Sequence, residues 1–403
     1  MPTSRLLPAK RVFEPVIDQH ETWLAVNPVQ GCPKDCGYCY LKDRGQTVAK
    51  PVELASPERT VALLKANPYF HTRAVLALYT CTDALATPPN RAHLVGLLDQ
   101  LTASGLRNPV CLITKCSVTD DVIAAILRAR TAGIPVIVYL SYSGLGPDIE
   151  RGIDHKALRA NFPRLHAHGI PVIHYWRPLI PANSAPETIT HVLDWAASYA
   201  TCSVAVGLKV KPGARAQLTP LWPELAEEGL PLETADAVWP RETWDLLESL
   251  PTRYPGHPIY QTNSCALAHV LGRPDSFLVH GTNTCTDNHC PAEQRARCAS
   301  ADRAEVSPDA VQKRLVWLGV PVVPDIRWDA ERRTATVEGP LALRDSNNVS
   351  QTLEVGVRAE RERGDRYWSG KFGGNQPLVL DSHNTSANPH PELEAPPSPG
   401  GVK

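Results

Sequence analysis

The strongest constraint on the fold is an alternation of short apolar runs with helical patterns between residues 23 and 210. The apolar runs, each expected to form a strand, are 23–28, 74–80, 109–114, 135–140, 171–175 and 203–210. The helical patterns between them are 57–66, 91–104, 119–132, 156–167 and 186–199. Strands that alternate with helices are typical of parallel βα units. The sequence therefore predicts an α/β fold, a partial (β/α)6 TIM-like barrel, with its chemistry at the carboxyl ends of the strands.

This rhythm ends near residue 210, and the remainder predicts a C-terminal α+β metal-binding extension. In it we expect a helix over 307–318 with Ser307 as its N-cap, and a hairpin of 322–328 with 333–338. Further strands are predicted at 351–359 and 367–372. The expected divisions are a leader (1–22), the barrel (23–212), a linker with short helices (213–254), a cysteine-rich metal segment (255–300), a small α+β domain (301–375) and a disordered tail (376–403).

Three cysteines, Cys32, Cys36 and Cys39, directly follow the first predicted strand with the spacing Cys-x-x-x-Cys-x-x-Cys. Thiolates are soft, anionic ligands suited to iron–sulfur clusters. Three of them can hold three irons of a 4Fe–4S cluster and leave the fourth iron open. Two alternatives stay open here: a zinc site, which lacks a nearby fourth ligand, and a disulfide with one cysteine left over.

The cysteine loop, with Tyr38 just before its last cysteine, resembles the signature of the radical S-adenosylmethionine superfamily. The residues that follow the later strands resemble its spore photoproduct lyase and photolyase-like branch, over residues 23–210. The common Gly-Gly-Glu segment after the second strand is absent, and Thr82-Asp83 stands there instead. The other matching stretches are Thr114-Lys115-Cys116-Ser117, Leu140-Ser141, Arg164-Leu165 with His168-Gly169-Ile170, and Arg177-Pro178-Leu179-Ile180-Pro181.

This resemblance implies an enzyme whose reduced cluster cleaves S-adenosylmethionine to a 5′-deoxyadenosyl radical, which abstracts hydrogen from a substrate that the sequence does not name. It also implies a lyase or oxidoreductase reaction and a reductant such as flavodoxin or ferredoxin. Cys81 matches the branch's hydrogen-donating cysteine, but it stands two residues before Asp83 rather than three. The implied cofactor-binding residues are Tyr38, Thr82, Asp83, Lys115, Ser141 and either Arg159 or Arg164.

A second group of cysteines, Cys265, Cys285, Cys290 and Cys298, lies in an irregular polar segment beyond the barrel. So many cysteines in such a context predict a metal site. One candidate is an auxiliary 4Fe–4S cluster held by all or three of them. The other is structural zinc, with His289 as a further ligand.

Bulk properties restrict the remaining choices. The formal net charge of −1 gives no global basic field for nucleic acid, so a nucleic-acid lesion repair lyase is the alternative within this class. A non-catalytic iron–sulfur sensor is the alternative outside it. Eleven cysteines without an export signal indicate the reducing cytoplasm and metal ligation. The sequence has no apolar stretch long enough to predict a membrane span.

Overall fold

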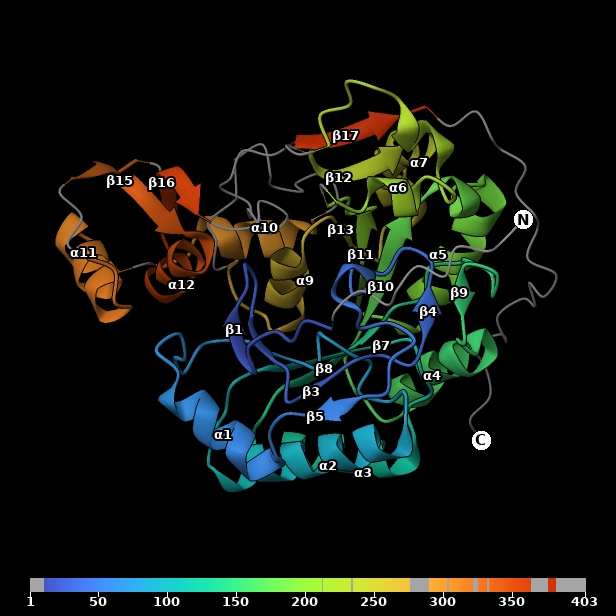
Figure 1. The fold of residues 1–403 in the computed structure, drawn as a ribbon, viewed down its shortest axis with the longest axis horizontal. Coiled ribbons are helices and arrows are strands. Elements are labelled where there is room, and N and C mark those ends of the chain that lie inside the picture. The colour runs from blue at the N-terminus through green and yellow to red at the C-terminus, as the bar shows by residue number, and fades with distance from the viewer. Residues whose placement is uncertain are drawn as a thin grey trace.

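The computed structural model describes residues 11–211, 213–232, 235–275, 290–302, 304–321, 325–331, 333–363 and 376–381. An eight-stranded sheet organises these residues, in the order β1-β2-β6-β7-β8-β10-β11-β13 (Figure 1). The six predicted strands form its parallel centre. They are β2 (Leu24–Val26), β6 (Leu76–Leu78), β7 (Val110–Thr114), β8 (Val136–Leu140), β10 (Val172–Leu179) and β11 (Cys202–Gly207).

Both edges of the sheet extend beyond the prediction. β13 (Ile259–Tyr260) adds a further parallel strand next to β11. β1 (Ile17–Gln19) pairs antiparallel with β2, so the predicted leader in fact supplies an edge strand. Only three residues form β1, which is why its short apolar pattern gave no signal.

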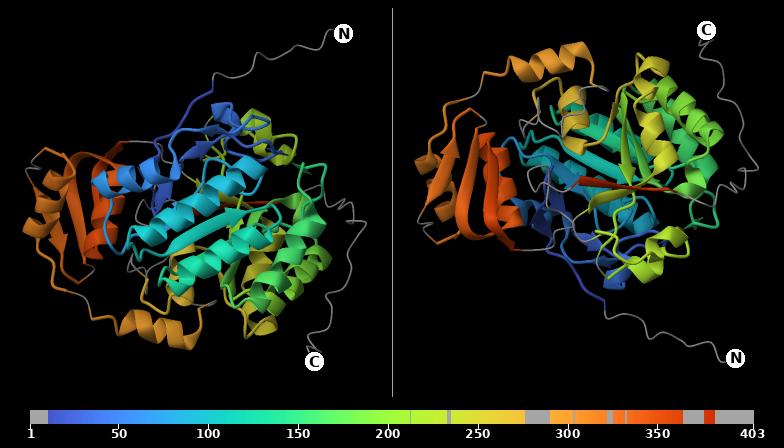
Figure 2. Two further views of the ribbon diagram at one scale, coloured as in Figure 1. Left: turned by 90° about the horizontal axis from the view of Figure 1, so that it is seen from below. Right: turned by 90° about the horizontal axis from the view of Figure 1, so that it is seen from above.

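The predicted helices cover one face of the sheet (Figure 2). Two of them, α1 and α5, begin and end where the patterns predict. Side-chain caps start three of them: Ser56, Thr87 and Asp154 each accept a backbone N–H of the first turn. The five helices are α1 (Pro57–Ala66), α2 (Pro88–Ala103), α3 (Asp120–Thr131), α4 (His155–Ala167) and α5 (Pro186–Tyr199).

Successive residues of the central strands face opposite sides, and both sides are buried, as expected for a parallel sheet between two layers. In β8, Val138 packs with the helices, whereas Tyr139 lies in a second apolar cluster on the inner face. That cluster also contains Trp23, which precedes β2. The rings of Trp23 and Tyr139 are 6.1 Å apart although their strands are not neighbours in the sheet. The sheet is therefore curved, as the partial barrel predicts.

The stretch predicted as a linker is packed structure. Its Trp222 is fully buried in a third apolar cluster, and its strand β12 (Ala235–Pro240) pairs in parallel with β17 (Gln376–Leu380). The expectation that disorder begins at residue 376 is therefore wrong for β17, because its apolar residues Leu378 and Leu380 pack with that cluster. Residues 382–403 lie outside the described residues. The short helices here are α6 (Arg215–Leu218), η3 (Pro223–Ala226), α7 (Arg241–Leu247) and α8 (Leu250–Arg253).

A smaller α+β unit follows. The predicted hairpin is present as β14 (Ile326–Asp329) and β15 (Thr334–Ala342), and Ser307 caps α11 (Pro308–Trp317) as predicted. The strand predicted at 351–359 is wrong in its first part, because α12 (Leu343–Leu353) continues to residue 353 before β16 (Gly356–Arg363) begins. The strand predicted at 367–372 lies outside the described residues.

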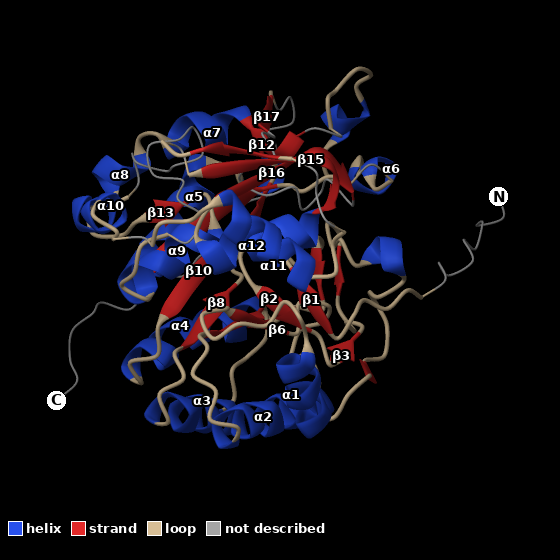
Figure 3. Cartoon of the chain, turned by 90° about the vertical axis from the view of Figure 1, so that its left-hand side faces the viewer, coloured by secondary structure: helices blue, strands red, loops and turns tan. Residues whose placement is uncertain are grey.

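Helix α12 attaches this unit to the barrel through polar contacts, in front of edge strand β1 in Figure 3. Asn348 is fully buried and donates to Gln19 Oε1 at 2.9 Å and to the Tyr69 carbonyl at 2.8 Å. Its Oδ1 accepts from the Arg314 guanidinium at 2.6 Å. A run of polar residues can therefore be buried here because both N–H donors of the Asn348 amide are used across the junction, while its oxygen accepts from Arg314 within the same unit.

We expect Asn348→Ala to lower the free energy of unfolding by about 1–3 kcal/mol, because it leaves buried donors and acceptors without partners. Asn347→Ala, next to it on the same helix, makes none of these contacts and is the matched control. Chemical denaturation checks both variants. Equal losses in the two would show that packing rather than this hydrogen-bond set joins the units.

Candidate functional site

The three-cysteine loop lies at the carboxyl end of β2, where a βα barrel places its chemistry. It leaves β3 (Val29–Gln30) through Gly31, whose φ is +100°, and a Cβ there would lie 1.9 Å from the Arg11 guanidinium. Glycine is therefore required at this turn. The loop then pairs β4 (Asp35–Cys36) antiparallel with β9 (Glu150–Arg151), which brings a distant carboxylate against the cysteines.

The three thiols lie close enough to influence one another. A charge on Cys39 raises the pKa of Cys32 and of Cys36, although burial is the largest cause and raises both pKa values to about 12. Burial also raises the pKa of Cys39. Within the described residues, no three His, Cys, Asp or Glu side chains converge closely enough to hold a single metal ion. A 4Fe–4S cluster takes one thiolate at each of three irons and can leave the fourth open, whereas a structural zinc site needs a fourth protein ligand that the loop does not supply.

Asp83 connects the ends of two neighbouring strands. Its carboxylate accepts the Lys115 N–H at 2.7 Å, the Leu85 N–H at 2.9 Å and the Thr114 hydroxyl at 2.9 Å. Tyr79, which directly follows β6, has a φ of 58°, an unusual backbone conformation for a tyrosine. The turn that carries Asp83 is therefore held by its own hydrogen bonds, and Asp83 is more than the simple helix cap that its position alone suggests.

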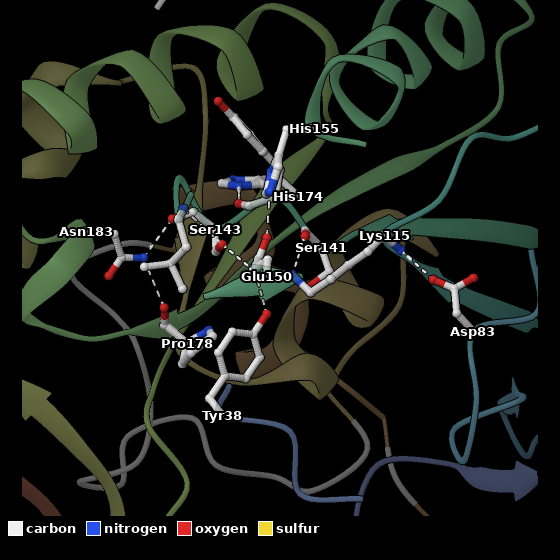
Figure 4. A network of polar contacts seen from close by, with 12 residues as sticks. Tyr38, Asp83, Lys115, Ser141, Ser143, Glu150, His155, His174, Pro178 and Asn183 are labelled. Atoms are coloured by element: carbon white, nitrogen blue, oxygen red, sulfur yellow. Dashed lines mark hydrogen bonds and ion pairs between the residues drawn. The ribbon is translucent and has the colours of Figure 1, made fainter. Parts of the chain in front are cut away.

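Glu150 is the centre of the polar network in Figure 4. It is fully buried, and its Oε1 accepts from the Lys115 ammonium at 2.9 Å, from the Ser143 hydroxyl at 2.7 Å and from the Tyr38 hydroxyl. The same ammonium lies 5.7 Å from the centre of the Tyr38 ring and donates to the Ser141 carbonyl at 2.7 Å. One of the two carboxylate oxygens of the buried Glu150 is therefore satisfied by an ion pair and by further hydrogen bonds.

The second oxygen of Glu150, Oε2, has no hydrogen-bond partner among the described residues, although the ring of His155 approaches to 3.7 Å. A buried carboxylate oxygen without a donor is costly, so this atom is an acceptor suited to a bound ligand. Glu150 was not predicted from the sequence, because a two-residue strand in a loop gives no periodic pattern. The loop that follows β8 contains two acidic residues, Asp148 and Glu150, and the sequence does not distinguish between them.

The predicted cofactor-binding residues do not all gather here. Tyr38, Lys115 and Ser141 belong to the Glu150 network, and Thr82 donates to the Gly31 carbonyl at 2.6 Å, at the start of the cysteine loop.

The two arginine candidates differ in their surroundings. Arg159 lies 5.7 Å from the Trp195 ring, and Arg164 forms an ion pair with the exposed Asp120 at 2.5 Å. The contacts of Arg164 are those of a surface ion pair, which leaves Arg159 as the better candidate.

Cys81 and Cys116 have different environments. Burial raises the pKa of Cys81 to about 12, and the charges that act on it come from Glu14 and Arg44 in the N-terminal segment. Burial also raises the pKa of Cys116, but that thiol is hydrogen-bonded to Asp83 and is influenced by Cys32. The thiol beside the Asp83 turn is therefore Cys116, and the catalytic role predicted for Cys81 stays a prediction.

A second cysteine site lies beyond β13. Cys265 is in α9 (Asn263–Val270). Cys290 lies two residues before α10 (Ala292–Ala299), and Cys298 lies in the last turn of that helix. The pKa of Cys290 is raised to about 11, mainly by burial and also by charges on Cys265 and Cys298, so these three residues are close to one another. Two other predicted ligands, Cys285 and His289, lie outside the described residues.

Comparisons with known proteins find similar solved structures. A mutant of spore photoproduct lyase with bound S-adenosylmethionine and dinucleoside spore photoproduct is 12% identical with a TM-score of 0.44, over 59% of this chain and 76% of that one. Streptococcus suis SuiB bound to S-adenosylmethionine is 12% identical with a TM-score of 0.34, over 48% of this chain and 43% of that one. No protein-family model and no curated protein matches the chain.

Spore photoproduct lyase also belongs to the branch whose strand-end motifs the sequence resembles. Both TM-scores are below 0.5, and the function of this chain is therefore inferred from its own residues. None of the helices described in this structure has the length and apolar character needed to cross a bilayer.

Proposed function

We propose that the chain is a radical S-adenosylmethionine enzyme. Cys32, Cys36 and Cys39 would hold a 4Fe–4S cluster with one open iron. When it is bound and reduced, the cluster supplies the electron that cleaves S-adenosylmethionine to a 5′-deoxyadenosyl radical. The observation that carries this proposal is a loop of three mutually close, partly buried thiols beside a charged network in which Glu150 Oε2 accepts no hydrogen bond from the described residues.

The chain's own residues have three tasks in this proposal. The first is to hold the cluster loop, which Glu150 does by backbone pairing with Cys36 and by accepting the Tyr38 hydroxyl. The second is to provide positive charge beside an anionic cluster. The Lys115 ammonium lowers the pKa of Cys36, so it lies within electrostatic reach of that thiol. The third is to receive the cofactor, for which Glu150 Oε2 offers an acceptor to a hydroxyl or ammonium group.

Burial supports radical chemistry at this place. Glu150 has no exposed surface, and the side chain of Lys115 is 14% exposed. A site that excludes water strengthens its ionic contacts and protects a reactive radical from side reactions.

We expect Asp83→Asn to weaken S-adenosylmethionine binding while leaving the first cluster's iron in place. An asparagine NH₂ at the position of Oδ2 would face the Lys115 N–H, donor against donor. Losing a charge-assisted hydrogen bond between the Asp83 carboxylate and the ammonium group of S-adenosylmethionine would cost about 1.5–3 kcal/mol. This corresponds to a roughly 10- to 150-fold higher Kd for the cofactor. Asp120→Asn, in an exposed ion pair, is the control. An unchanged Kd in Asp83→Asn would limit Asp83 to a structural role.

The proposal also includes an auxiliary iron–sulfur cluster at the second cysteine site. Cys265, Cys290 and Cys298 support it by their mutual closeness, with Cys285 kept as a predicted ligand. We expect about eight irons per chain after anaerobic reconstitution, four for each cluster. Iron and zinc analysis of the same sample is the measurement. About four irons with one zinc would instead favour the structural zinc alternative.

The experiment that tests the enzyme assignment is titration of the reduced, reconstituted protein with S-adenosylmethionine, followed by electron paramagnetic resonance. Binding to an open iron must change the signal of the first cluster. A variant with alanine at Cys265, Cys290 and Cys298 keeps only that cluster and simplifies the spectrum. A signal that is unaffected by saturating S-adenosylmethionine would favour the non-catalytic sensor.

A further inference from the structure

We propose that His269, in place of Cys285, is the fourth protein ligand of the second iron–sulfur cluster, together with Cys265, Cys290 and Cys298. The inference rests on the proposed function, which includes that cluster. It adds a ligand that the cysteine pattern does not contain and gives the site a mixed set of one imidazole and three thiolates.

Helix α9 places two of these residues on one face. Cys265 and His269 are four residues apart in the helix, so their side chains are neighbours one turn from each other. The helix starts directly after β13, and Thr262 caps it by accepting the Cys265 N–H at 3.4 Å. The orientation of both side chains is therefore set by regular, capped structure rather than by a loop.

Tyr260, in β13, connects this face with the other cysteines. Its hydroxyl lies 4.0 Å from Cys290 Sγ, and its ring centre lies 5.8 Å from that of His269. Cys265 lies in the same buried apolar cluster as Tyr260, and Cys290 packs against that cluster. One aromatic side chain is therefore in contact with or close to three of the four proposed ligands.

Cys298 has the surroundings of a ligating thiolate. Its Sγ accepts the backbone N–H of Asp275 and the side-chain amide of Gln294, both at 3.4 Å. Gln294 is 2% exposed and is fixed by a second bond to the Arg273 carbonyl at 2.9 Å. Hydrogen bonds to the sulfurs are a recurring feature of cluster sites.

The observation that singles out His269 is its unpartnered ring nitrogen. Nδ1 is buried and has no hydrogen-bond partner among the described residues. Buried polar atoms are rarely left so, and coordination to iron would satisfy this one. The nearest charged groups on α10, Arg297 and Glu293, form an ion pair with each other at 2.7 Å. Neither the Arg297 guanidinium nor the Glu293 carboxylate therefore requires His269 as its partner.

One imidazole and three thiolates can bind the four irons of a 4Fe–4S cluster, one ligand to each iron, and the same set also occurs at structural zinc. Imidazole is neutral where thiolate is anionic, and replacing thiolates by histidines raises a cluster's reduction potential. The mixed set therefore predicts two clusters of different potential in one chain.

The test uses the full chain with Cys32, Cys36 and Cys39 changed to alanine, so that only the second cluster remains. After reconstitution, pulsed electron paramagnetic resonance of the reduced protein should show a directly coordinated nitrogen. Labelling histidine with ¹⁵N should shift this coupling, and His269→Cys should remove it while keeping the iron and lowering the reduction potential. His168→Ala, at an exposed position of the barrel, is the matched control.

The outcomes separate the inference from the proposal on which it rests. Loss of the nitrogen coupling in His269→Cys, with iron retained, supports the ligand assignment. A second cluster whose nitrogen coupling is missing from the start, or persists in His269→Cys, overturns the role of His269 but leaves the second cluster in place. Absence of iron from the protein with alanine at Cys32, Cys36 and Cys39 overturns the second cluster itself. Because His269→Cys offers a replacement ligand, a folding failure of His269→Ala does not affect the test.

Discussion

Alanine at Cys32, Cys36 or Cys39 is expected to reduce the cleavage of S-adenosylmethionine to background. Each cysteine supplies one of three protein ligands, and the loop holds no spare. We expect each variant to lose about four irons per chain and to keep those of the second site. Iron analysis and quantification of 5′-deoxyadenosine after reduction are the two measurements.

The control for these variants is Cys111→Ala. Cys111 is fully buried within the inner apolar cluster of the barrel, so its replacement tests the cost of losing a cysteine from the core. It should keep all its iron and its cleavage activity. Normal cleavage in any variant of the loop would mean that the three cysteines do not hold the cluster that does the chemistry.

Glu150→Gln is expected to have the second largest effect, on stability and on cofactor binding together. The substitution neutralises a fully buried carboxylate and leaves the nearly buried Lys115 ammonium without its counter-charge. Breaking a buried ion pair typically costs about 3–5 kcal/mol. Gln also carries an NH₂ group in place of one carboxylate oxygen. The Oε2 atom, which accepts no hydrogen bond from the described residues, would then no longer be available as an acceptor, so the affinity for S-adenosylmethionine should fall as well.

Asp99→Asn is the matched control for Glu150→Gln. Asp99 pairs with Arg128 at 2.9 Å, the same distance as Glu150 and Lys115, but both side chains of this pair are about half exposed. Surface ion pairs contribute about 0–1 kcal/mol, so Asp99→Asn should unfold almost like the wild type. Thermal unfolding and isothermal titration with the cofactor compare the two. Equal effects would show that the buried network around Glu150 has no special role.

The barrel was predictable because its strands and helices carry local periodic patterns. The residues of β8 alternate between two buried faces, and α1 has both its N-cap, Ser56, and its first-turn proline in the sequence. The cysteine loop was equally clear, since its spacing is local.

The features that could not be predicted depend on contacts between distant residues. β12 pairs with β17, far along the chain, and no local pattern of either strand specifies this partner. The polar face of α12 is buried because Asn348 finds partners on the barrel, which a polar sequence pattern cannot indicate. Glu150 reaches the cysteine loop through the pairing of β4 with β9, and His269 became notable only when the structure showed its Nδ1 buried and, among the described residues, unpartnered.

Reducing the anaerobically reconstituted wild-type protein in the presence of S-adenosylmethionine and identifying the adenosine product tests most directly whether the first cluster cleaves the cofactor. We expect 5′-deoxyadenosine, formed in proportion to the iron of the first cluster and absent from the Cys32→Ala, Cys36→Ala and Cys39→Ala variants. A fully reconstituted wild-type protein that forms no 5′-deoxyadenosine would contradict the proposed function. So would a variant with alanine at Cys32, Cys36 and Cys39 that forms as much 5′-deoxyadenosine as the wild type.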